Sequence, residues 1–168
     1  MQNKVATYLA LVSKLKFLAN SKRDEALELI VNLLGNLPPQ TCMMDEEQLK
    51  NLQRLGHEIG AHTASHSILG EQTKDVAFSE IQTSKLYLDQ VLHSPIDTFA
   101  FPNGYFPRDF NQEHIDMVKQ LGFKSACSTN DGGIISSSNR YAISRFMPHR
   151  KEKNQFCLSI QKIAGEHV

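Results

Sequence analysis

A chain of 168 residues is long enough to form one domain with a substantial buried core. Its 18 basic and 18 acidic side chains balance, which gives no reason to expect nucleic acid or an anionic membrane as a partner. Lys4, Lys14 and Lys16 interrupt the apolar stretch near the N-terminus, so it predicts neither a signal peptide nor a membrane span. The cysteines are widely spaced and form no CxxC pair, which is typical of reduced thiols. We therefore expect a cytoplasmic protein, unless an upstream segment directs it elsewhere.

The first part of the chain is predicted to be helical. Apolar residues recur at helical spacing over residues 5–18 and 26–34, and Gly35 followed by two prolines ends the second pattern. A third helix is expected over residues 44–55, with acidic residues near its start. Residues 1–44 carry no recognisable chemistry, and we interpret them as a helical extension.

Strands and helices are predicted to alternate in the rest of the chain. Short apolar runs indicate strands at residues 59–61, 98–101, 123–128 and 141–147. Helical patterns lie between and after them, at residues 73–91, 111–121 and 156–163. This order is typical of βαβ units around a parallel sheet, and about four strands are too few for a closed barrel. We therefore predict a single α/β domain over residues 1–168.

The most informative segment is residues 56–66, which read GHEIGAHTASH. His62 and His66 stand four residues apart, so their side chains lie to roughly the same side and their nitrogens can converge on one metal ion. The apolar run before them predicts a buried strand that ends in this loop, where α/β proteins place chemistry. A catalytic zinc needs a third protein ligand, and none stands beside the pair. The alternative is an ordinary surface or core histidine pair.

This segment resembles the His-[Ser/Thr]-x-x-His motif of the polysaccharide deacetylases of the NodB-homology type, carbohydrate esterase family 4. Residues 99–104, FAFPNG, resemble the next motif of that family, with the same order and separation. The resemblance covers about residues 40–147. It implies a partial (β/α) barrel-like parallel sheet, here with extra N-terminal helices. It also implies one divalent metal, most commonly zinc, and an N-acetylated polysaccharide or oligosaccharide as the substrate.

The resemblance implies roles for particular residues. The metal ligands would be His62 and His66. The turn at Pro102, Asn103 and Gly104 would line the substrate site, with the Asn103 amide as the oxyanion contact.

Two further candidates lie at the end of the last predicted strand and just after it. His149, in the sequence Phe-Met-Pro-His, is a loose candidate for the catalytic general acid, and its alternative is an exposed histidine in a basic turn. Arg145 is a candidate substrate contact, and its alternative is pairing with a loop carboxylate.

The chain also departs from the family pattern. In the family, a pair of aspartates supplies the third metal ligand and the general base, and this chain has no such pair. The resemblance therefore implies that this chain begins after the first strand of the family's domain. Asp109 and Asp131 remain open as substitute carboxylates. We therefore expect weak or absent metal binding and deacetylation. The alternatives are a degenerate, non-catalytic scaffold or metal-binding module, and an unrelated metal-dependent hydrolase.

Three structural expectations complete the sequence-based picture. A sheet that lacks its first strand has an unpaired edge, which favours a homodimer. Phe99 and Phe101 alternate with Ala100 and are expected in the core. His114 lies near the start of a predicted helix and is expected to face solvent.

Overall fold

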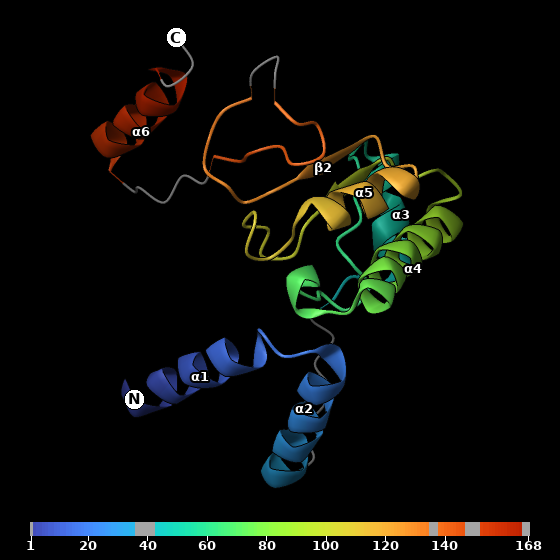
Figure 1. Cartoon of the computed structure of the whole chain (residues 1–168), viewed down its shortest axis with the longest axis vertical. Helices are drawn as coiled ribbons and strands as arrows, with labels where there is room; N and C mark the ends of the chain where they lie inside the picture. The colour runs from blue at the N-terminus through green and yellow to red at the C-terminus, as the bar shows by residue number, and fades with distance from the viewer. Residues whose placement is uncertain (1, 36–42, 135–137, 147–151, 166–168) are drawn as a thin grey trace.

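The structure, a computed structural model, describes residues 2–35, 43–134, 138–146 and 152–165. The helices within these ranges are α1 (Gln2–Leu15), α2 (Asn20–Leu34), α3 (Glu46–Arg54), the 3-10 turn η1 (Leu69–Glu71), α4 (Lys74–Leu92), α5 (Gln112–Gln120) and α6 (Lys153–Gly165). The regular strands are β1 (Thr98–Ala100) and β2 (Ser125–Cys127). Figure 1 shows α3, α4 and α5 gathered around the sheet, with α1 and α2 forming an arm on one side and α6 standing apart on another.

The sheet is parallel and is extended on both sides by single bridge residues. β1 pairs with β2, and Phe99 lies opposite Ala126. Ala61 bridges to Phe99 on one side, and Ile143 bridges to Cys127 on the other. All four segments predicted as strands therefore lie next to one another in a parallel arrangement. This confirms the predicted α/β fold with a partial, barrel-like sheet.

The two outer segments are much shorter than predicted. Next to Ala61, Gly60 is exposed and Ile59 is only partly buried, so the expected buried strand shrinks to one bridging residue. On the other side, the Ala142 N–H closes a turn on the Asn139 carbonyl, which leaves Ile143 as the residue that continues the ladder. The sequence pattern overestimated the lengths of these two strands, because turns at the edges of the sheet replace strand-to-strand hydrogen bonds.

Side-chain caps fix where the shorter helices begin. Asp45 accepts from the Gln48 backbone and the Gln48 side chain accepts from the Asp45 N–H, so this capping box starts α3 directly after Asp45. Asn111 and His114 form the corresponding box at the start of α5. Gly35, with φ of +76°, ends α2 as predicted.

The core is built from phenylalanines between the sheet and the helices α4 and α5. Phe99 and Phe101 are each 1% exposed, which confirms their predicted place in the core. Phe101 stacks on Phe110 with ring centroids 3.7 Å apart, and Phe123 lies 5.4 Å from Phe99. This cluster holds the loops that follow Ala61 and β1 at one edge of the sheet.

The N-terminal helices leave much of their apolar surface uncovered. The exposed side chains include Val5, Leu9, Leu29 and Leu33, the last of them 86% exposed. α2 has no buried residue among those described. No helix in the described ranges combines the length and the apolar character that crossing a bilayer requires.

Candidate functional site

The histidine loop begins at the sheet and turns back sharply. Ala61 donates its N–H to the Thr98 carbonyl and accepts from the Ala100 N–H, which fixes the start of the loop against β1. Thr63 and His66 then adopt positive φ angles of 64° and 56°. These turns bring the His62 and His66 rings together, with centroids 4.8 Å apart and planes at 76°. The two imidazoles therefore lie side by side at one end of the sheet.

One hydrogen bond orients the first of these rings. Nδ1 of His62 lies 2.6 Å from the Ala100 carbonyl, which can only accept, so this nitrogen carries the proton. The other nitrogen, Nε2, is left with a free lone pair, the arrangement that metal-binding histidines commonly have. Partial burial of the ring lowers the pKa of His62, the bond to Ala100 works in the opposite direction, and the charges of His66 and Arg145 add to the lowering. The neutral, ligand-competent form is thus favoured.

A hydrogen-bond network at the surface of the domain holds the rest of the loop. The Glu80 carboxylate accepts from the backbone N–H and the hydroxyl of Ser65, at 2.9 and 2.8 Å, and from the Asn20 amide at 2.9 Å. The Ser67 N–H donates to the Thr63 hydroxyl. Sequence reasoning missed Glu80 and Asn20, because their partners are distant in the chain and no local pattern links them.

The Pro-Asn-Gly turn lies beside the histidine loop. Asn103 and Gly104 both have positive φ, and Gly104 accepts from the Thr129 N–H while the Thr129 hydroxyl donates to the Asn103 carbonyl. Pro102 is buried beneath this turn. The backbone N–H of Asn103 donates to no acceptor among the described residues. A pocket lined by both His66 and Asn103 connects the turn to the second histidine of the pair.

Arg145 lies close to the histidine pair, and it does not pair with a loop carboxylate, the alternative considered from the sequence. Its Nε donates to the Ser128 carbonyl at 2.6 Å rather than to a carboxylate, and its charge is near enough to lower the pKa of His62. His149 lies outside the described residues. The structure therefore brings together the histidine pair, the Pro-Asn-Gly turn and Arg145.

The two candidate substitute acids do not join this cluster. Asp109 is 1% exposed, and it accepts from the Arg108 side chain at 2.7 Å and from the Tyr105 N–H at 3.0 Å. It is thus a structural acid. Asp131 is exposed. Over the described part of the chain, no group of three His, Cys, Asp or Glu side chains is placed to hold a metal.

His114 is not solvent-facing, as the sequence suggested, but 4% exposed. Its Nδ1 accepts from the Asn111 N–H at 3.1 Å, and a hydrogen bond links it to the Leu69 backbone. Burial of the ring lowers the pKa of His114, against smaller opposing effects of Glu113 and the Leu69 bond. The expectation was wrong because the start of α5 packs against η1, a contact that no local pattern shows.

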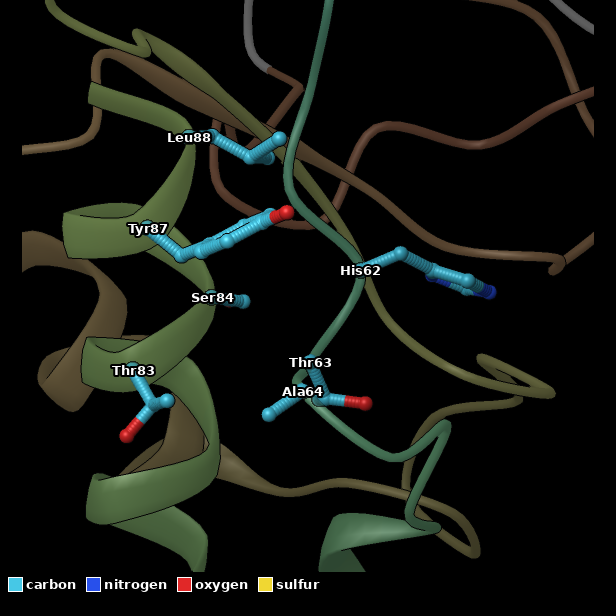
Figure 2. A pocket seen from close by; sticks show the side chains of 7 residues that line it. All are labelled: His62, Thr63, Ala64, Thr83, Ser84, Tyr87 and Leu88. Carbon is cyan, nitrogen blue, oxygen red and sulfur yellow. The ribbon is translucent and has the colours of Figure 1, made fainter. Parts of the chain in front are cut away.

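A second pocket, of about 260 Å³, lies between residues 62–64 and α4. Figure 2 shows that the His62 imidazole points away from the helix residues Ser84 and Tyr87 that line it. This pocket therefore lies on the opposite side of the loop from the histidine pair, and it is not the candidate metal site.

One of the comparisons with known proteins identifies a family. The family model for polysaccharide deacetylase matches residues 17–126, which is more than half of the chain. No curated protein sequence gives a significant match.

Several solved structures share the fold. A Streptococcus pyogenes deacetylase in complex with acetate has a TM-score of 0.62 and 22% identity, over 74% of this chain and 52% of that one. A Bacillus cereus polysaccharide deacetylase has a TM-score of 0.60 and 21% identity, over 70% of this chain and 36% of that one. A de-N-acetylase from Aggregatibacter actinomycetemcomitans has a TM-score of 0.55 and 15% identity, over 76% of this chain and 58% of that one. This chain thus spans about half, or less, of the first two structures. Because the family model matches more than half of its length, the chain belongs to the polysaccharide deacetylase family, and the solved structures share its fold.

Proposed function

We propose that this chain carries part of a metal-dependent site for removing the N-acetyl group from a polysaccharide or oligosaccharide. The observation that carries the proposal is the His62–His66 pair, with Nδ1 of His62 bonded to the Ala100 carbonyl and Nε2 left free. Neutral imidazole nitrogens suit zinc and related divalent ions. The donor chemistry therefore fits such an ion, although the pair supplies fewer protein ligands than a complete zinc site has.

The chain's own residues have distinct tasks in this proposal. A divalent metal, when bound, supplies Lewis-acid polarisation of the N-acetyl carbonyl and a more acidic attacking water. The free backbone N–H of Asn103 is suited to donate to the oxyanion that develops on the carbonyl oxygen. Arg145, tied to the Ser128 carbonyl, provides a fixed positive charge for a polar group of the substrate.

Among the residues that the structure describes, no carboxylate is placed beside the pair to act as the general base. The one buried aspartate in this region, Asp109, is bonded to Arg108, and no carboxylate in the described ranges joins the histidines as a third member. Because general-base catalysis contributes a factor of about 10²–10⁴, we expect this chain to have weak or no turnover. The same observation favours the second candidate, a non-catalytic scaffold or metal-binding module of the deacetylase type.

Acetate release from N-acetyl-chitooligosaccharides separates the two candidates. With zinc or cobalt supplied, a deacetylase site predicts slow, metal-dependent release that His62→Ala and His66→Ala abolish. Metal binding without any release favours the non-catalytic module. Release that is independent of both metal and the two histidines contradicts the proposal.

A further inference from the structure

The turn between the two histidines is held by Glu80, a residue of α4. The Ala64 N–H donates to the Glu80 backbone carbonyl at 3.1 Å, and the Ser65 N–H donates to the Glu80 carboxylate at 2.9 Å. The Ser65 hydroxyl donates to the same carboxylate at 2.8 Å. Glu80 therefore fixes both of the residues that lie between Thr63 and His66.

This turn has a conformation that its residues do not favour on their own. Thr63 and His66 have φ angles of 64° and 56°, in the left-handed region that residues with a Cβ rarely adopt. A positive φ is especially unfavourable for Thr63, because its side chain is β-branched. Such a backbone persists only where the surrounding structure determines it. The bonds to Glu80 lie between the two strained residues, so they oppose the relaxation of the turn.

The Glu80 side chain meets hydrogen-bond donors at both of its oxygens. One oxygen accepts from the Ser65 N–H, and the other accepts from the Ser65 hydroxyl and from the Asn20 amide. A glutamine here would turn an NH2 group toward one of these donors, because only a carboxylate accepts at both oxygens. Hydrogen bonds to a carboxylate are also stronger than those between neutral groups. The negative charge of Glu80 is therefore part of what holds the turn.

Glu80 is not itself placed as a metal ligand. Both of its oxygens are occupied by donors, and no carboxylate in the described part of the chain joins the histidine pair as a third ligand. The His62 ring is oriented separately, by its bond to the Ala100 carbonyl. His66 directly follows Ser65, so its position relative to His62 depends on the turn. Glu80 thus acts on the pair through the placement of His66.

We propose that Glu80 is a positioning residue for the metal site, whose carboxylate keeps the His66 ring beside the His62 ring by holding the turn between them. The proposal rests on the proposed function, because it takes the histidine pair as the ligand set. Without the carboxylate, the turn relaxes and the two imidazole nitrogens no longer converge on one ion. Ala64 and Ser65 are exposed and lie outside the core, so the fold should survive this change.

The first test uses NMR of the whole chain without metal. The ring centroids of His62 and His66 are 4.8 Å apart, so the parent chain should show a nuclear Overhauser effect between the two rings. Glu80→Gln should weaken this effect at least about threefold and leave the aromatic contacts of the core in place. The matched control is Glu71→Gln, which removes an exposed carboxylate at the end of η1 and should leave the effect unchanged.

This test decides the inference whether or not the chain binds zinc. An effect between the rings that is absent from the parent chain, or unchanged in Glu80→Gln, overturns it. An effect that falls equally in Glu71→Gln also overturns it, because any lost negative charge would then have the same consequence.

The second test measures zinc affinity by calorimetry. Loss of a residue that orients a metal ligand typically lowers the affinity by about 10–100-fold, so Glu80→Gln should weaken zinc binding about tenfold or more. A residue with a merely structural role would lower the stability to urea without changing the zinc affinity of the folded chain. Equal zinc affinities of Glu80→Gln and the parent chain overturn the inference. A parent chain that binds no zinc counts against the proposed function instead, and the ring contact then decides the inference.

A smaller change covers the case in which Glu80→Gln does not fold. Ser65→Ala removes the hydroxyl donor but keeps the carboxylate and the Ser65 N–H bond, and it should weaken zinc binding about threefold. Because both residues act through the same bonds, the combined variant should bind zinc no more weakly than Glu80→Gln alone. Effects that multiply, or a Ser65→Ala variant with unchanged affinity and an unchanged ring contact, contradict the proposal.

Discussion

The histidine loop and the N-terminal helices border the same pocket, yet they are stabilised in opposite ways. The loop is fixed by backbone bonds to β1, by the Glu80 carboxylate and by the phenylalanine core beneath it. The helices are tied to it by polar bonds at Asn20 and Arg23, while Leu29 and Leu33 remain 65% and 86% exposed. The positions of the two histidines therefore depend on the sheet and the core, whereas α1 and α2 leave an apolar surface exposed to solvent. Four predictions test this contrast, beginning with the largest effect.

Core and arm should respond very differently to the loss of an apolar side chain. Phe99→Ala removes a ring that is 1% exposed and should lower the free energy of unfolding by about 3–5 kcal/mol. Leu33→Ala removes a side chain that is 86% exposed and should change it by no more than about 0.5 kcal/mol. Urea denaturation of both variants measures the difference. Similar losses in the two variants would mean that α2 is packed as firmly as the core.

The turn beside the histidines should not tolerate a side chain at its glycine. Gly104 has φ of +74°, and a Cβ there would meet the Phe101 carbonyl oxygen at 2.7 Å. Gly122 has a similar φ of +82° but open space around it, so it is a matched control. Gly122→Ala should lower the free energy of unfolding by the backbone strain alone, about 1–2 kcal/mol. Gly104→Ala should lower it by clearly more, because the steric clash adds to the strain. NMR should show the His62 resonances shifted only in Gly104→Ala; equal costs and unshifted resonances would argue against a rigid turn.

The buried cap of α5 should make stability depend on pH. Burial lowers the pKa of His114, so the unfolded chain takes up a proton near pH 6.5 that the folded chain resists. The contribution of neutral His114 to the free energy of unfolding is fully present above about pH 6.5. It is lost as the pH falls below this value, by up to about 1.4 kcal/mol per pH unit.

His114→Gln keeps an acceptor for the Asn111 N–H and removes this titration. Urea denaturation at several pH values between 5 and 8 should therefore give the variant a flatter profile than the parent chain. His62 contributes the same slope to both proteins, because its pKa is also lowered. Identical profiles would show that His114 is protonated as readily in the fold as in the unfolded chain.

The exposed apolar surface of the arm should promote weak self-association. We propose that a second copy of the chain covers α1 and α2, because large exposed apolar patches commonly mark interfaces. Leu29→Gln combined with Leu33→Gln should then shift light scattering toward the monomer and reduce the binding of a hydrophobic dye. A clean monomer of the parent chain at high concentration, without dye binding, would remove the basis for a homodimer.

The features that depend on local pattern were predictable from the sequence. Apolar periodicity located the helices and all four sheet segments, because each is specified by its own residues. The His62–His66 pair could be recognised because both residues belong to one loop, and the Pro-Asn-Gly turn because its motif is contiguous.

The features that depend on distant contacts were not predictable. Asn20 and Ser65 are 45 residues apart, so their hydrogen bond leaves no local signal. His114 is buried because η1 packs over the start of α5, and Asp109 turns inward to bond the backbone of Tyr105. The outer strands were predicted too long because apolar runs do not reveal where turns interrupt a ladder.

Calorimetric titration with zinc tests the central claim most directly, namely that His62 and His66 form an incomplete metal site. We predict measurable binding that falls well short of the roughly 10 kcal/mol of a structural zinc site, and that disappears in both His62→Ala and His66→Ala. His93→Ala is a matched control, because His93 is an exposed histidine at the end of α4, away from the pair. Tight stoichiometric binding would reveal a third ligand, and binding that survives both substitutions would contradict the claim.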